Sequence, residues 1–543
     1  MKKASVFLRC TVYLCVLGAL PNSAAAPAHK PPIAEIATGK VKGVAEGGVE
    51  VFRGIPFAQP PVGDLRWRSP LPAQPWSGIL DASEYQPDCA QPGQARSSED
   101  CLYLNIFRPV AERAGLPVMV WVQGGSNIFG GASLFPGHGI AQNGVILVTF
   151  NYRVGRLGFF AHPSLRQEST GQPTVNFGHH DMLAALRWVQ NNIGAFGGDP
   201  RNVTIFGESA GGGGVLTLLT QPIPEGLFSK AIVQSAGLPT SRSGLAGYTT
   251  LAAAEATGLA FAAKVGITGH DRNAAASLRS LPISVLVDDL DPVRETLAIG
   301  GVGTSSPGLP GATIDGVTVT SNTEDILNAA QQARISIIIG ANSADLALGY
   351  ADSKDSLFKQ FGDFAGRARV IYDPSGLADL KKIRDQVFSD KFYVEPSRYH
   401  ADLNAKAGIQ TWVYRFSYVA DAFRPNAVGA SHASEIPFIF GAPERFNFRQ
   451  GIAAGPATTD GDRAMAALIN RYWINFASTG DPNGAELPHW PEHQEGAAEL
   501  LDFTGSGPVF TVDPFKERLD LWRDYWDSQS QAQPIFSTKT NSR

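Results

Sequence analysis

The 543-residue chain has little cysteine, little charge and, after its first residues, no long apolar run. Charged residues make up 17% of it, below the roughly 25% of an average soluble domain. The net charge is −5 and no basic block is present, which argues against nucleic acid as a partner. No apolar stretch of the mature chain approaches the roughly 18 residues of a spanning helix, so no stable membrane anchor is expected.

The first 26 residues have the pattern of a secretory signal peptide. Lys2, Lys3 and Arg9 supply positive charge, Cys10–Leu20 is a short apolar stretch, and Ala24–Ala26 offers a small-residue cleavage site. The apolar stretch, about eleven residues, is too short to span a bilayer. We therefore predict export of the mature chain, to the periplasm or the medium.

Only four cysteines are present, and two of them, Cys10 and Cys15, leave with the signal peptide. The mature chain keeps Cys89 and Cys101, and an exported protein with two nearby cysteines favours a disulfide over two free thiols. Such a bond closes a loop of about 13 residues and contributes on the order of 3 kcal/mol. Histidine and cysteine show no metal-ligand spacing, so no metal or organic cofactor is expected.

Apolar residues make up 43% of the chain, enough for a large core. Nearly continuous β-branched or aromatic runs indicate buried strands at 116–122, 145–152, 203–206, 231–234 and 335–339. Apolar positions near a 3.6-residue period predict helices at 181–193, 210–219, 465–479 and 515–526. This alternation predicts an α/β fold, with a large, mostly parallel central sheet and helices on both faces.

The mature chain is expected to form one catalytic domain over residues 27–528. Two less regular segments, 238–325 and 346–430, are predicted to be excursions from the sheet that build the wall of a pocket. The polar tail, 529–543, is predicted to be frayed.

The strongest chemical signal is the G-x-S-x-G run Gly207–Gly211, which follows a predicted strand and precedes a predicted helix. Such a turn forces Ser209 into a strained backbone state and lifts its hydroxyl clear of the sheet. The N–H of Ala210, at the start of the helix, can then face a developing oxyanion. We predict that Ser209 is a nucleophile; the alternative is a plain Gly-Ser turn.

Several motifs together carry a family resemblance: 54–58 (GIPFA), 99–106 (EDCLYLNI), 151–153 (NYR), 196–211 (FGGDPRNVTIFGESAG) and 476–483 (FASTGDPN). From about residue 36 to residue 526 the chain resembles the type-B carboxylesterase/cholinesterase family. The resemblance implies an α/β-hydrolase fold with an extended N-terminal sheet, and a disulfide between Cys89 and Cys101.

A serine hydroxyl needs a base, and in α/β-hydrolases the order along the chain is Ser, acid, His. His432 lies in the run 429–441 (GASHASEIPFIFG), which is similar to the family's catalytic-histidine loop. We therefore predict His432 as the general base for Ser209. His493, which follows a Trp-Pro pair, is predicted to lie at the surface.

The family places the acid five residues after a glycine that ends a strand, and here that residue is Asp345. The family usually has Glu followed by Gly, whereas this chain has Asp followed by Leu346, so the loop must come about 1 Å closer. Asp352 is a second candidate, and a solvated loop carboxylate is the alternative reading of Asp345. Ser235 resembles a family serine that hydrogen-bonds the acid, and Glu208 matches a residue that lines the pocket beside the nucleophile.

The chain departs from the family pattern at 123–127, where it reads Gln-Gly-Gly-Ser-Asn in place of His-Gly-Gly-Gly and an aromatic residue. By position, the N–H groups of Gly125, Ser126 and Ala210 form the oxyanion hole. A positive φ at Ser126 would cost about 1 kcal/mol. The polar side chains of Ser126 and Asn127 favour a pocket for a polar or bulky acid rather than acetate; neutral drift is the alternative.

Together these features predict a serine hydrolase that cleaves a small-molecule carboxylic ester through an acyl-enzyme on Ser209, with His432 as base and Asp345 as orienting acid. One alternative is a catalytically silent adhesion or binding protein on the same fold. Another is an amidase, a thioesterase or a lipase, because substrate choice lies in the pocket rather than in the fold. The expected oligomeric state is a monomer or a homodimer.

Overall fold

The structure is a computed structural model that describes residues 30–110, 114–168, 173–222, 225–236, 248–288, 290, 311–346, 351–444 and 458–532. The predicted signal peptide and the tail beyond Ala532 lie outside the described residues. So do residues 238–247, 289 and 291–310 of the first predicted excursion, and 347–350 of the second.

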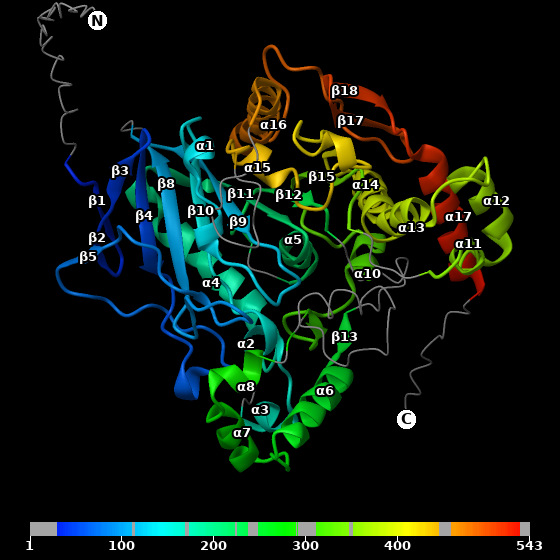
Figure 1. Cartoon of the computed structure of the whole chain (residues 1–543). Coiled ribbons are helices and arrows are strands. Elements are labelled where there is room, and N and C mark those ends of the chain that lie inside the picture. The colour runs from blue at the N-terminus through cyan, green and yellow to red at the C-terminus, as the bar shows by residue number, and fades with distance from the viewer. Residues whose placement is uncertain are drawn as a thin grey trace, which may run out of the picture.

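A large sheet runs through the molecule (Figure 1). Within the described ranges it has eleven strands, in the spatial order β18 (Gly507–Val512), β17 (Glu499–Thr504), β16 (Thr411–Phe416), β15 (Ser336–Asn342), β12 (Lys230–Gln234), β11 (Gly198–Glu208), β9 (Leu116–Val122), β10 (Ile146–Phe150), β8 (Tyr103–Pro109), β4 (Val49–Pro56) and β3 (Val44–Glu46). Neighbouring strands are parallel from β17 to β10 and antiparallel at both margins. The carboxyl ends of the parallel strands therefore meet at one edge.

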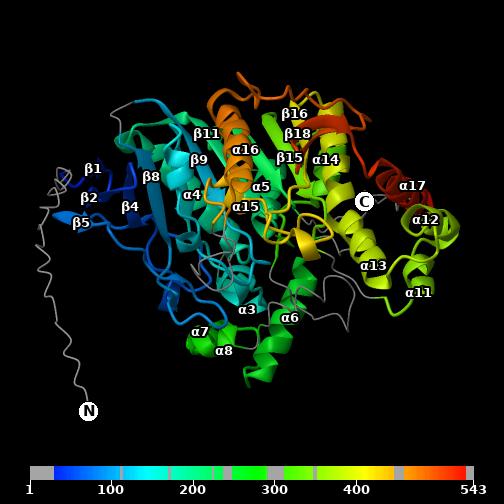
Figure 2. The same cartoon turned by 45° about the horizontal axis from the view of Figure 1, so that its top comes forward.

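Successive side chains of a strand point to opposite faces of the sheet, so strand β9 contributes side chains to two separate cores. Val118, Val120 and Val122 belong to one core, and Met119 and Trp121 belong to the other. The first core includes residues of the helices α4 (Phe177–Asn192), α5 (Ala210–Thr220) and α14 (Glu395–Lys406). The second includes residues of α1 (His138–Ala141), α15 (Ile436–Ile439) and α16 (Asp460–Thr479), and Figure 2 shows α16 lying across the strands. The predicted α/β architecture, with helices on both faces of the sheet, is confirmed.

The helices outside these layers form two satellite cores. One contains residues of α2 (Gly155–Phe159), α3 (Pro163–Glu168), α6 (Leu251–Lys264), α7 (Arg272–Arg279) and α8 (Ile283–Val287). The other contains residues of α11 (Lys354–Lys359), α12 (Ala365–Tyr372), α13 (Leu380–Ser389), the π-helix η5 (Asp390–Val394) and α17 (Lys516–Ala532).

Short elements complete the described chain. The strands are β1 (Ile33–Ile36), β2 (Gly39–Lys42), β5 (Ile79–Asp81), β6 (Asp88–Cys89), β7 (Ser97–Ser98), β13 (Thr249–Thr250) and β14 (Thr313–Ile314). The helices are α10 (Thr323–Asn328) and the 3-10 turns η1 (Gly63–Leu65), η2 (Ala132–Leu134), η3 (Ile193–Phe196), η4 (Gly362–Phe364) and η6 (Arg424–Asn426). None of the helices that the structure describes combines the length and apolar character needed to cross a membrane.

The predicted strands overlap β9, β10, β11, β12 and β15, and the predicted helices overlap α4, α5, α16 and α17. Two boundaries were wrong. The predicted excursion 346–430 contains β16, which is a strand inside the sheet. The strand was missed because Arg415 interrupts its apolar run. The charge of Arg415 is balanced by the carboxylate of Asp513, which is distant in the sequence. Residues 529–532 of the predicted frayed tail belong to helix α17.

Candidate active site

Ser209 occupies the sharp turn between β11 and α5. Its backbone has φ 57° and ψ −126°, a sparsely populated conformation that costs about 1–3 kcal/mol and persists only when the surroundings enforce it. The glycines two positions before and after Ser209 allow this turn to pack closely against strand β9. A Cβ on Gly211 would lie 2.1 Å from the carbonyl oxygen of Val122, and a Cβ on Gly207 would lie 2.7 Å from the same atom. Both glycines of the motif are therefore required by the approach of β9, as the nucleophile turn predicts.

The structure brings the three predicted catalytic side chains together. His432 Nε2 lies 2.8 Å from Ser209 Oγ, and His432 Nδ1 lies 2.5 Å from Asp345 Oδ1. Asp345 is buried at the end of the loop after β15, where its carboxylate accepts the N–H groups of Asn342 and Leu346. These two backbone bonds hold the carboxylate in place beneath the imidazole.

A second carboxylate, that of Glu208, lies near the imidazole. Glu208 is buried, and its Oε1 lies 3.2 Å from His432 Nε2. Burial raises the pKa of Glu208 well above its ordinary value. Burial alone would lower the pKa of His432, but the negative charges of Glu208 and Asp345 outweigh it and raise that pKa. The arrangement favours the imidazolium, the species that forms when a histidine takes a proton from serine.

Three side chains near this triad are absent from the sequence-based prediction. Glu435 is fully buried and accepts the Asn342 side-chain amide, which also donates to the carbonyl of Ser431 beside His432. The ring of Tyr393, from the π-helix η5, lies 5.1 Å from the imidazole centroid. Glu435 stands three residues after His432 and could have been suspected, whereas nothing in the sequence around Tyr393 points to the triad.

The oxyanion turn that follows β9 has three successive residues with positive φ. The values are 110° at Gly125, 55° at Ser126 and 57° at Asn127. Asparagine tolerates this left-handed conformation, but serine pays about 1 kcal/mol for it. The turn lies against the nucleophile, since a Cβ on Gly124 would be 3.1 Å from the Cβ of Ser209. Gly125, Ser126 and the start of α5 at Ala210 thus flank the serine.

Three other predicted positions differ from expectation. The hydroxyl of Ser235 is buried and has no hydrogen-bond partner among the described residues, so its predicted bond to the acid is absent. Asp345 instead accepts from backbone N–H groups and from the imidazole. Asp352 is exposed and bonded to nearby serines. His493, predicted at the surface, is only 6% exposed, and its Nε2 lies 2.9 Å from Asp402 Oδ1.

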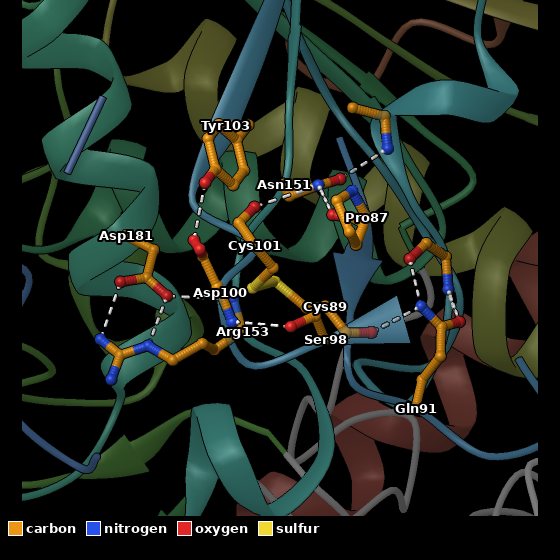
Figure 3. The surroundings of a disulfide bond; sticks show 12 residues. Pro87, Cys89, Gln91, Ser98, Asp100, Cys101, Tyr103, Asn151, Arg153 and Asp181 are labelled. Atoms are coloured by element: carbon orange, nitrogen blue, oxygen red, sulfur yellow. Dashed lines mark hydrogen bonds and ion pairs between the residues drawn. A yellow bond between two sulfur atoms is a disulfide. The ribbon is translucent and has the colours of Figure 1, made fainter. Parts of the chain in front are cut away.

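Cys89 and Cys101 form a disulfide (Figure 3). The Asn151 amide donates to the carbonyl oxygens of Cys101 and Pro87, and the Gln91 amide donates to the carbonyl of Cys89. The cystine is fully buried. The disulfide therefore joins the end of β6, at Cys89, to Cys101, which lies just before strand β8 of the large sheet.

A mostly parallel sheet, a serine on the turn after one strand, and a histidine and an acid after later strands define the class: this is an α/β-hydrolase fold. The solved structure of PNB esterase superposes with a TM-score of 0.76 at 32% identity, over 91% of this chain and 99% of that one. Residues 30–522 match the model of the Carboxylesterase family. The chain belongs to this family and is an ester hydrolase.

Relatives in sequence agree with this assignment. The chain is 35% identical over 526 residues to fumonisin B1 esterase of Sphingopyxis macrogoltabida, with 92% of each protein covered. It is 34% identical to para-nitrobenzyl esterase of Bacillus subtilis, over 85% of this chain and 93% of that protein.

Proposed function

We propose that the chain hydrolyses carboxylic esters through an acyl-enzyme on Ser209, with His432 as general base and Asp345 as the orienting acid. The observation that carries the proposal is the single imidazole that contacts the serine hydroxyl through Nε2 and the buried carboxylate through Nδ1. A serine alcohol becomes a competent nucleophile when a base positioned in this way takes its proton.

Each group has one task in the reaction. Ser209 Oγ attacks the ester carbonyl while its proton moves to His432 Nε2. N–H groups at Gly125, Ser126 and Ala210 stabilise the oxyanion, and the imidazolium then protonates the leaving alcohol. His432 then deprotonates a water molecule, which attacks the acyl carbonyl and forms a second tetrahedral intermediate. When this intermediate collapses, the carboxylic acid leaves and Ser209 recovers its proton from His432.

A fluorophosphonate probe tests the nucleophile. It should label the wild-type protein but not Ser209→Ala, and His432→Ala should be labelled far more slowly. Ser389→Ala is the control: Ser389 is a buried serine on α13 that has no hydrogen-bond partner among the described residues, so it lacks the imidazole contact of Ser209, and this variant should be labelled like the wild type. Labelling of Ser209→Ala at the wild-type rate, or near-wild-type ester turnover by His432→Ala, would refute the assignment.

We infer that the acyl part of the substrate is polar or bulky. Ser126 and Asn127 place polar side chains on the turn beside the nucleophile, where the family usually has glycine and an aromatic residue. A relative that shares 35% identity over 526 residues is fumonisin B1 esterase, so similar chains include an esterase for a substrate other than a simple acetate ester. A panel of polycarboxylate, aromatic and acetate esters, with amide analogues, tests this inference; a preference for acetate would overturn it.

We also propose that the protein is exported. The charged and apolar pattern of its first 26 residues supports this proposal, and so does the buried disulfide, which persists in oxidising compartments. Mass spectrometry of the mature N-terminus should find cleavage after Ala26 or Ala28. Recovery of the protein in the cytoplasm with Met1 retained would contradict export.

A further inference from the structure

The imidazole of His432 has two possible acceptors at one nitrogen. Its Nε2 lies 2.8 Å from Ser209 Oγ and 3.2 Å from Glu208 Oε1, while Nδ1 is held by Asp345. A small rotation of the ring would therefore exchange the serine for the charged carboxylate. The ring nitrogens bond in the plane of the imidazole, so other groups have to support its faces.

The ring of Tyr393 packs against this imidazole. The two centroids are 5.1 Å apart and the planes are inclined at 56°, within the range of interacting aromatic pairs. Tyr393 is 4% exposed and belongs to the satellite core that contains residues of α12, α13 and α17. That core therefore holds the tyrosine ring beside His432.

The sequence explains why the helix opens at this point. Tyr393 lies on the π-helix η5, three residues before Pro396 on α14. Proline has no N–H to donate, and its ring clashes with the carbonyl four residues earlier, which is that of Phe392. The wider π-turn accommodates this break, and such turns are rare and frequently lie at functional sites. The turn thus sets the direction in which Tyr393 leaves the helix.

A buried ion pair fixes the start of the same π-helix. The carboxylate of Asp390 accepts from Arg518 Nε at 2.6 Å and Nη2 at 2.5 Å, and from the Tyr372 hydroxyl at 2.6 Å. Asp390 is fully buried. These contacts tie η5 to α17 and α12, so Tyr393 can withdraw from the imidazole only if the satellite core opens.

The phenol of Tyr393 adds no charge to the site. Burial and the negative charges of Asp345 and Glu208 raise the pKa of Tyr393 well above its ordinary value, so the hydroxyl stays protonated. Within the described chain, the hydrogen bonds of the triad side chains join them to one another and to two backbone N–H groups, and none reaches this hydroxyl. The contact with His432 is therefore one of packing.

We propose that Tyr393 is a positioning residue for ester hydrolysis: its ring packs on the imidazole and keeps Nε2 of His432 turned to Ser209 rather than to Glu208. This inference rests on the proposed role of His432 as general base. Without the ring, the imidazole would be bonded to Glu208 for part of the time, and the proton of Ser209 would then have no acceptor. Because Tyr393 acts through His432 and not on the substrate, its loss should change kcat and leave KM nearly unchanged.

Two substitutions separate the ring from the hydroxyl. Tyr393→Leu removes the ring and should lower kcat by about 10²-fold, the loss expected when a catalytic group is misplaced by about 1 Å, with KM within about threefold of wild type. Tyr393→Phe keeps the ring and should retain kcat within about twofold of wild type. Values of kcat are counted per site titrated with a fluorophosphonate, so that unfolded protein does not enter them.

Phe392→Leu is the matched control. Phe392 is buried on the same π-helix, but its ring stacks on Phe388 at 5.8 Å. This variant should keep the wild-type kcat. An unchanged kcat in Tyr393→Leu, an equal loss in Tyr393→Phe, or an equal loss in Phe392→Leu would each overturn the positioning role. None of these results touches the triad, which fails instead if His432→Ala stays active.

Discussion

Replacing Asp345 by asparagine tests the proposed mechanism most sharply, because the structure shows why the amide cannot serve. The carboxylate accepts three hydrogen bonds: Oδ1 from His432 Nδ1–H and from the N–H of Leu346, and Oδ2 from the N–H of Asn342. An amide offers one accepting oxygen. If that oxygen takes the place of Oδ2, the NH₂ group faces His432 and stabilises the tautomer that carries its proton on Nε2. That tautomer cannot accept the proton of Ser209.

In the other orientation the amide keeps the bond to His432, but its NH₂ group meets the N–H of Asn342, and the negative charge that stabilises the imidazolium is lost. Either arrangement should lower kcat by about 10⁴-fold, as expected when the acid of a Ser-His-Asp triad becomes an amide. This loss corresponds to about 5 kcal/mol of activation free energy. Steady-state hydrolysis of a p-nitrophenyl ester measures it.

Asp345→Glu is the control, since it keeps the carboxylate and carries the residue usual in the family. It should retain far more activity than Asp345→Asn while its extra methylene displaces the loop. Thermal unfolding of both variants separates catalysis from folding. If Asp345→Asn, correctly folded, kept kcat within about tenfold of the wild type, the proposed role of this carboxylate would be refuted.

Three further predictions concern charge and the disulfide. Glu208→Gln removes the negative charge that raises the pKa of His432, so the acid limb of the pH profile of kcat/KM should move down by about one unit; an unmoved limb would contradict the coupling. Burial disfavours the charged form of Asp88 and raises its pKa to about 6 from 3.8. The protonated carboxyl therefore leaves the fold at full stability below pH 3.8, and that stability is lost as the pH rises through 6 and the buried group ionises. Asp88→Asn should therefore gain about 2–3 kcal/mol over wild type between pH 4 and pH 7 in denaturant unfolding, and an equal difference at both pH values would contradict this. Replacing Cys89 and Cys101 together by serine should lower the free energy of unfolding by about 3 kcal/mol in urea, and reductant should then have no further effect on the variant.

The sequence carried most of the local information about this protein. Its apolar runs predict five strands of the sheet, and its glycines predict the nucleophile turn at Ser209. These features depend on neighbours along the chain, through period-two or period-3.6 patterns and through the backbone freedom that a tight turn requires. The candidates for base and acid came from motif similarity rather than from any local physical rule.

The tertiary structure decided what distant segments do to one another. It placed Tyr393 and Glu435 around the imidazole and left the Ser235 hydroxyl without the predicted bond. It buried Arg415 beside Asp513, a partner 98 positions away, so that a strand with a charge in its middle could lie inside the sheet. Contacts of this kind depend on which segments pack together, and a single sequence carries no signal for such long-range pairing.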